Sequence, residues 1–101
     1  MFQNLSINKG IIRLNDCDFD INDKLENLYH NSLKEDLLQI EFDNSYLIDV
    51  GWYPEFDKNG KFIILLLKNN DWDNPIKEIK TRDLKELDEI VRFLIKENNK
   101  L

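Results

Sequence analysis

The sequence predicts an α+β fold of two layers, a mainly antiparallel four- to five-stranded sheet with a C-terminal amphipathic helix packed on one face. Two apolar runs, residues 46–53 and 61–68, flank an Asn59-Gly60 pair, which is typical of a β-hairpin. Near the C-terminus, apolar residues recur at three- and four-residue intervals, as in an amphipathic helix. A length of 101 residues suits one core, so residues 1–101 are expected to form a single domain.

The first third of the chain predicts one strand and one short helix. Residues 7–14 carry Ile and Leu side chains around Gly10, which favours a short strand with a bulge at the glycine. Asp23 and Glu26 have the spacing of a capping box, in which each side chain binds a free backbone N–H at the start of a helix. We therefore expect a helix of about ten residues from Lys24 onward.

The middle of the chain predicts the remaining strands. Residues 37–43 alternate between two faces, as a strand with one wet face does. The side predicted to face water holds Leu37, Gln39, Glu41 and Asp43. Residues 46–53 form the next strand, and its partner over residues 61–68 is apolar on both faces, which predicts a position inside the sheet. Residues 76–81 predict a last, exposed strand.

The C-terminal segment predicts a helix that covers the sheet. Asp83 and Glu86 repeat the capping-box spacing, so the helix is expected to begin here and to end near residue 97. Its apolar stripe consists of Leu84, Leu87, Ile90, Val91, Leu94 and Ile95. Such a stripe needs an apolar surface to cover, and the inner faces of the preceding strands supply one.

Charge is unevenly distributed along the chain. The net charge is −6, but residues 1–57 hold four bases and twelve acids, giving −8, while residues 58–101 hold ten bases and eight acids, giving +2. An acidic segment repels phosphate, so we expect no nucleic-acid partner and favour a basic protein partner. The alternative is that the acidity only keeps a small protein soluble.

The sequence also favours the cytoplasm. The apolar run over residues 62–67 is far shorter than the roughly 20 residues that span a bilayer, and the first fifteen residues lack the continuous apolar segment of a secretory signal. Cys17 has no second cysteine with which to form an internal disulfide, as expected in a reducing compartment. We expect no membrane association.

No motif in the chain specifies a cofactor, a metal or a reaction. The Asp16-x-Asp18-x-Asp20 spacing is that of a calcium loop, but Ile21 stands where the loop needs Gly and Asn27 where it needs Glu, so no metal site is predicted. The three glycines form no phosphate-binding loop. We expect no cofactor and no enzymatic activity.

Two segments place aromatic residues among acids at the ends of predicted strands. They are residues 52–57 (W-Y-P-E-F-D) and residues 71–75 (D-W-D-N-P). Trp and Tyr are common anchors at protein interfaces, and surrounding acids steer a basic partner. The alternative is structural, with Trp52 in the core and Trp72 covering its edge.

The segments I-D-V-G-W-Y-P (48–54), D-W-D-N-P (71–75) and T-R-D-L-K-E-L (81–87) resemble small bacterial immunity proteins of contact-dependent growth inhibition and other polymorphic toxin systems. The resemblance covers about the second half of the chain. It implies a cytoplasmic, non-enzymatic inhibitor that binds the toxin domain of its cognate effector, often a basic nuclease. Under this hypothesis the expected partner-binding residues are Trp72, Asp71, Asp73, Glu55, Asp57, Asp16, Asp18 and Asp20.

Two alternatives remain open. The chain could be an acidic protein-binding module of another kind, such as a phage-borne inhibitor or a regulatory domain that occupies a nucleic-acid site on its partner. It could also be a small enzyme, for which Cys17 and His30 are a conceivable nucleophile and base.

Overall fold

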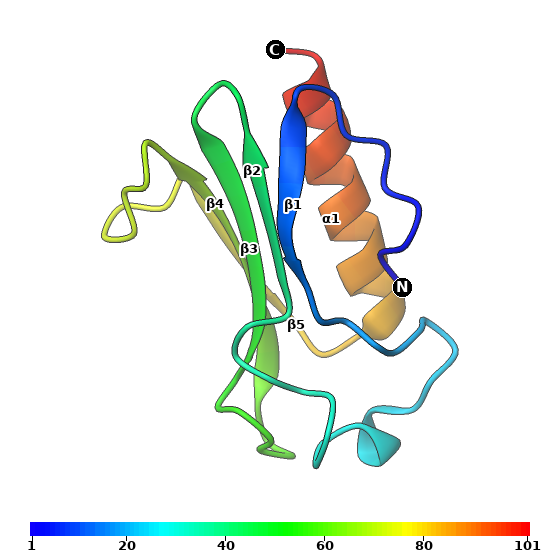
Figure 1. Cartoon of the computed structure of the whole chain (residues 1–101). Coiled ribbons are helices and arrows are strands. Elements are labelled where there is room, and N and C mark those ends of the chain that lie inside the picture. Colours follow the sequence, from blue (N-terminus) through cyan, green and yellow to red (C-terminus); the bar gives the residue numbers. More distant parts are fainter.

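The computed structural model describes residues 1–101 as a five-stranded antiparallel sheet with one α-helix on one face (Figure 1). The strands lie in the order β1-β2-β3-β4-β5, so each strand pairs with its neighbour in sequence. This arrangement confirms the predicted α+β two-layer fold. The elements are β1 (Gly10–Asn15), a 3₁₀ turn η1 (Leu25–Asn27), β2 (Leu38–Phe42), β3 (Tyr46–Tyr53), β4 (Lys61–Lys68), β5 (Lys77–Thr81) and α1 (Leu84–Asn99).

The core lies between the sheet and α1, where the inner faces of β2, β3 and β4 meet the apolar stripe of the helix. Ile40, Ile48 and Ile64 are fully buried there, as their alternation predicts. Leu37 is also fully buried in this core, so its predicted position on the wet face is wrong. Leu37 lies just before β2, and its N–H donates to the carbonyl of Val50. It therefore does not follow the alternation of side chains within the strand.

The N-terminal segment covers the same side of the sheet as α1 (Figure 1). Phe2 is buried in the core, and its carbonyl accepts a 2.7 Å hydrogen bond from Nδ2 of Asn15. The terminal amino group of Met1 donates a 2.9 Å hydrogen bond to the carbonyl of Phe19. These contacts close the core on the side of β1.

Two predictions for the first third are wrong. The first strand starts at Gly10 rather than residue 7, and its register shift falls at Arg13, between Ile12 and Leu14, instead of at the glycine. The expected helix from Lys24 is reduced to the 3₁₀ turn η1, which has no side-chain cap. The carboxylate of Asp23 accepts from the N–H of Asp20, which lies before the expected helix.

Helix α1 begins as predicted at Leu84 and continues two residues beyond the expected end, to Asn99. The Asp83 carboxylate accepts a 2.9 Å hydrogen bond from the N–H of Glu86, which satisfies one free donor of the first turn. The capping box also predicts that the Glu86 side chain accepts from the N–H of Asp83. In the structure this N–H donates to Oγ1 of Thr81 at 3.1 Å instead. No helix in the structure is both long enough and apolar enough to cross a membrane.

Strands β3 and β4 form the predicted hairpin, with Tyr46 opposite Lys68 and Tyr53 opposite Lys61. Strand β4 lies between β3 and β5, as its two apolar faces predict. The connection is the longer loop 54–60, in which Asn59-Gly60 is not a two-residue turn. Gly60 serves close packing, because a Cβ there would lie 2.5 Å from Nε1 of Trp52.

The opposite face of the sheet, which neither α1 nor the N-terminal segment covers, is called here the open face (Figure 1). Its central side chains alternate with those of the core. They are Gln39 on β2, Leu47, Asp49, Gly51 and Tyr53 on β3, and Ile63, Leu65 and Leu67 on β4. In Figure 1 the loop 69–76 between β4 and β5 projects from the sheet on the side away from α1. The open face therefore has this loop at one end.

Candidate protein-binding surface

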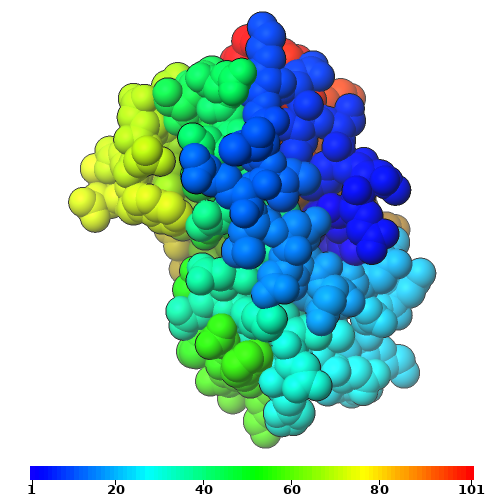
Figure 2. Space-filling view, viewed as in Figure 1, coloured from blue at the N-terminus to red at the C-terminus, as the bar shows by residue number.

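The predicted partner-binding residues fall into three groups in the structure. The loop between β4 and β5 carries one group, the loop between β3 and β4 carries the second, and the segment after β1 carries the third. The last two groups meet at one end of the sheet, while the first lies at the opposite end, where β3 begins and β4 ends. Figure 2 shows the residues near 30–36 beside the loop 54–60 at the lower end, with loop 69–75 standing apart on the left.

The loop 69–75 presents an aromatic side chain between two acids. Trp72 is 50% exposed, and Asp71 and Asp73 are exposed on either side of it. The loop is held to the β2–β3 turn by a 2.9 Å hydrogen bond from the N–H of Asn69 to the carbonyl of Ser45. Asn69 and Asn70 adopt a left-handed backbone, which Asn tolerates better than most residues. The loop thus holds Trp72 half exposed at the surface.

The second end of the sheet gathers acids around one lysine. Nζ of Lys34 lies 2.8 Å from Oδ2 of Asp16. This hydrogen bond raises the pKa of Lys34, and the charges of Asp18 and Glu55 raise it further. The carboxylate of Glu55 also accepts a hydrogen bond from the N–H of Glu35 at 3.2 Å. We call this group the acidic end, and it consists of Asp16, Asp18, Glu35, Asp36 and Glu55.

Asp57 and Asp20, two of the predicted partner-binding residues, form hydrogen bonds within their own loops. Oδ1 of Asp57 accepts from the N–H of Asn59 at 2.7 Å, and the carbonyl of Asp57 accepts from Nε1 of Trp52 at 2.8 Å. Oδ1 of Asp20 accepts from the N–H of Ile21 at 2.8 Å. Both carboxylates therefore hold the shape of their own loops.

The exposed aromatic residue at the acidic end is Phe56. Trp52 is fully buried in the core, where its ring lies 4.8 Å from that of Phe62, as the structural alternative for Trp52 expects. Phe56 is 42% exposed and has a φ of 60°, an uncommon backbone conformation for a bulky side chain. Its N–H donates to the carbonyl of Leu33 at 2.8 Å, which fixes the loop against the residues before β2.

Two residues of β3 on the open face, Asp49 and Tyr53, were not among the predicted partner-binding residues. Asp49 is a carboxylate in the middle of β3, yet it is only 3% exposed. Burial raises its pKa, the hydrogen bond from Gln39 lowers it, and the charge of Asp36 raises it. Burial also raises the pKa of Tyr53, and the charges of Asp49, Asp36 and Glu35 add to this. The signal in the sequence was a single acid inside an otherwise uncharged strand.

The conceivable nucleophile and base share no hydrogen bond, and one is buried while the other is exposed. Cys17 is buried, and this burial raises the pKa of its thiol to about 12. His30 is exposed in the turn region that follows η1, and it takes part in none of the side-chain hydrogen bonds or ion pairs of the chain. No group of three or more His, Cys, Asp or Glu side chains is arranged to hold a metal ion.

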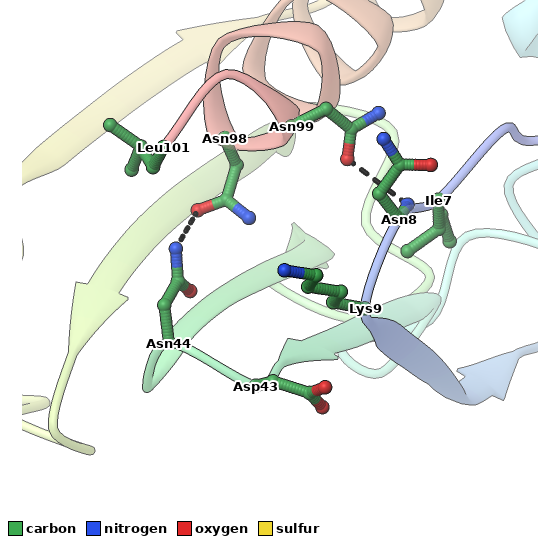
Figure 3. Close-up of a pocket in the computed structure, with 8 residues that line it drawn as sticks. All are labelled: Ile7, Asn8, Lys9, Asp43, Asn44, Asn98, Asn99 and Leu101. Carbon is green, nitrogen blue, oxygen red and sulfur yellow. Dashed lines mark hydrogen bonds between the residues drawn. The ribbon is translucent and has the colours of Figure 1, made fainter.

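A pocket of about 730 Å³ lies elsewhere, between the N-terminal segment, the β2–β3 turn and the end of α1 (Figure 3). Its amide side chains tie these segments together. Nδ2 of Asn44 donates to Oδ1 of Asn98 at 3.3 Å, and the N–H of Asn8 donates to Oδ1 of Asn99 at 3.1 Å. The predicted partner-binding residues do not line it. These contacts indicate a structural junction.

Comparison with protein-family models, with curated proteins and with solved structures found no match to this chain.

Proposed function

We propose that this protein is a cytoplasmic immunity protein, without enzymatic activity, that binds and neutralises a basic toxin domain. The observation that carries the proposal is the acidic end, where Asp16 pairs with Lys34, where the charges of Asp18 and Glu55 act on the same lysine, and where Glu35 and Asp36 are exposed. Five carboxylates near one ammonium group leave this end strongly negative. Such a surface attracts a basic partner and repels nucleic acid.

The arrangement also suits inhibition of a nuclease. A nuclease domain binds phosphate through Lys and Arg side chains, and carboxylates at matching positions compete for the same groups. Long-range attraction raises the association rate, and this effect weakens as salt screens it. The acidic end therefore accounts for fast capture of the toxin.

Trp72 accounts for slow dissociation. It is half exposed between Asp71 and Asp73, at the other end of the open face from Glu55. Large aromatic side chains that become buried at an interface contribute much of its binding energy. A partner lying along the open face contacts both ends, and loop 69–76 projects on that side of the sheet (Figure 1).

Capture of the partner is the direct test. The tagged protein is used to isolate binding proteins from its own cells, and each captured domain is expressed alone and together with this protein. We expect a basic domain that stops growth when expressed alone and that is neutralised by co-expression. Capture of a non-toxic host or phage nucleic-acid-binding protein instead would favour the alternative, an acidic module that occupies a nucleic-acid site.

Charge reversal locates the surface. Asp16→Lys with Glu55→Lys changes the acidic end, and Glu89→Lys with Glu97→Lys on exposed positions of α1 makes the same change in net charge elsewhere. We expect the first pair to abolish neutralisation and the second pair to retain it. Equal protection by both double variants would contradict a role for the acidic end.

A further inference from the structure

Asp49 is a buried carboxylate without a cation. It is 3% exposed, and its one hydrogen bond is from Nε2 of Gln39 to Oδ1, at 2.8 Å. Oδ2 accepts no hydrogen bond within the chain, and since no buried side-chain oxygen or nitrogen lacks a partner, Oδ2 must be open to solvent. None of the ion pairs in the structure includes Asp49. A carboxylate placed in this way normally has a cationic or donor partner.

A second free acceptor lies beside it. Gly51 follows Asp49 on the open face, and a Cβ at Gly51 would lie 1.9 Å from the carbonyl oxygen of Glu35 and 2.7 Å from Cε2 of Tyr53. The carbonyl oxygen of Glu35 accepts no hydrogen bond from the backbone or from a side chain. The missing side chain at Gly51 therefore lets the Glu35 carbonyl and the Tyr53 ring lie directly on the sheet, next to Asp49.

The surroundings offer acceptors and negative charge, but almost no donors. Burial raises the pKa of Tyr53, and the negative charges of Asp49, Asp36 and Glu35 raise it further. Leu65 lies opposite Asp49 on β4 and forms an apolar wall. An apolar wall lowers the local dielectric constant and strengthens an ion pair formed there.

No cation of the open face forms an ion pair with Asp49. Arg13 pairs with Glu41, and Lys80 lies 3.6 Å from Glu78. Lys61 is opposite Tyr53 at the end of the hairpin, and it takes part in no ion pair with a carboxylate of the chain. The cluster around Asp49 is thus complementary to a positive group from outside the chain.

We propose that Asp49, the Glu35 carbonyl and Tyr53 form a receptor for one arginine side chain of the protein partner. This inference rests on the proposed function for the identity of the partner. Arginine fits better than lysine because its planar guanidinium has five N–H donors and stacks on or beside aromatic rings. Gln39 is a positioning residue, since its hydrogen bond to Oδ1 fixes the carboxylate and leaves Oδ2 for the ligand.

The test uses the isolated protein with a small probe, so it does not depend on finding the partner. N-acetyl-arginine amide is titrated into ¹⁵N-labelled protein, and the signals of the Gly51 amide and the Gln39 side-chain amide are followed. N-acetyl-citrulline amide, which has the same shape without the charge, is the matched control ligand. We expect saturable shifts with the arginine probe in the low-millimolar range and none with citrulline.

Two variants make the test specific. Asp49→Asn keeps the shape and the contact with Gln39 but removes the charge, and we expect it to weaken probe binding by about tenfold or more. Glu78→Gln makes the same change in net charge opposite Leu65 on β5 and is expected to retain binding. Absence of saturation in the unmodified protein, or equal binding by Asp49→Asn, overturns the receptor. Either result leaves the immunity proposal intact, because that proposal fails only if no toxin is captured and neutralised.

Discussion

Gln39 and Asp49 face each other across β2 and β3, and Nε2 of Gln39 donates a 2.8 Å hydrogen bond to Oδ1 of Asp49. An uncharged amide is a weak partner for a buried carboxylate, because it offers hydrogen bonds without neutralising the charge. The pair therefore positions Asp49 at a cost in stability. A binding partner that supplies a cation removes this cost.

The first prediction concerns the pH dependence of folding. Burial raises the pKa of Asp49 in the folded protein. Between the unfolded and folded pKa values the folded state binds more protons than the unfolded state, so the contribution of Asp49 to stability falls as the pH rises through this window. Asp49→Asn should raise the melting temperature at pH 7, and the gain should shrink as the pH falls through this window and be lost below about 4, near the unfolded pKa of Asp. Thermal unfolding from pH 3 to 8 measures this, and a variant less stable than the parent at pH 7 would contradict it.

The second prediction concerns the start of α1. Asp83→Ala removes the acceptor for the N–H of Glu86, and it should cost about 1 kcal/mol of unfolding free energy. For a domain of this size that corresponds to a fall in melting temperature of about 4–8 °C. Glu86→Gln is the control, because Thr81 and not Glu86 binds the N–H of Asp83, and its effect should stay within about 0.5 kcal/mol. If Glu86→Gln were as costly as Asp83→Ala, the cap would depend on Glu86 after all.

The third prediction concerns Arg82, whose guanidinium holds the loop between β3 and β4. It donates to the carbonyl of Gly60, to the carbonyl of Lys58 at 3.0 Å and to the hydroxyl of Tyr29 at 3.2 Å. Arg82→Ala should cost about 1 to 2 kcal/mol and speed hydrogen exchange of the Asp57 and Gly60 amides.

Arg82→Lys should restore little of this protection, because one ammonium group cannot reproduce the forked set of bonds. Arg92→Ala is the matched control, since Arg92 pairs with Asp88 along the helix and does not contact the loop. Equal exchange of the loop amides in Arg82→Ala and Arg92→Ala would show that the clamp does not stabilise the loop.

Local patterns predicted most of the fold because the strongest elements are also the most regular. The bounds of β3 and β4 coincide with the predicted runs, residues 46–53 and 61–68, and the cap of α1 lies at Asp83 as expected. The helix from Lys24 is shortened to η1, and long-range contacts hold the residues that come after it. The carbonyls of Leu33 and Lys34 accept from the N–H groups of Phe56 and Trp52, so the chain here is bound to β3 and its loop.

The candidate surface was harder to predict, because it depends on contacts between residues that are distant in sequence. Alternation places Asp49 on the outer face of β3, but it does not show that the carbonyl of Glu35 lies over Gly51. That contact brings together residues distant in sequence, and alternation alone does not show that Asp49 is buried. Likewise, the spacing of Asp16 and Asp18 gave no reason to group them with Glu55, which depends on the position of Lys34.

The fourth prediction concerns the thiol of Cys17. Burial raises its pKa to about 12, so almost no thiolate exists at pH 8. Reaction with a disulfide reagent at pH 8 should be more than about a hundredfold slower in the folded protein than in denaturant. Fast modification of the folded protein would instead indicate a reactive cysteine and would favour the enzymatic alternative. In that case Cys17→Ala with His30→Ala should abolish activity, whereas an inhibitor should still neutralise its toxin.

The last prediction separates capture from retention of the partner by kinetics. Trp72→Ala should raise the dissociation rate by about tenfold or more, because a buried aromatic anchor acts mainly on dissociation. Asp16→Lys with Glu55→Lys should lower the association rate instead, and this effect should fade at high salt because mobile ions screen the attraction.

Surface binding measurements with the captured toxin domain, at low and high salt, give both rates. Phe93→Ala is the matched control for Trp72→Ala, since Phe93 is a similarly exposed aromatic residue on α1, 53% exposed against 50%. If the toxin domain dissociated from Trp72→Ala as slowly as from Phe93→Ala, the partner would contact the acidic end without reaching the loop 69–75. A partner held along the open face requires that only Trp72→Ala dissociate faster, because α1 lies on the other side of the sheet (Figure 1).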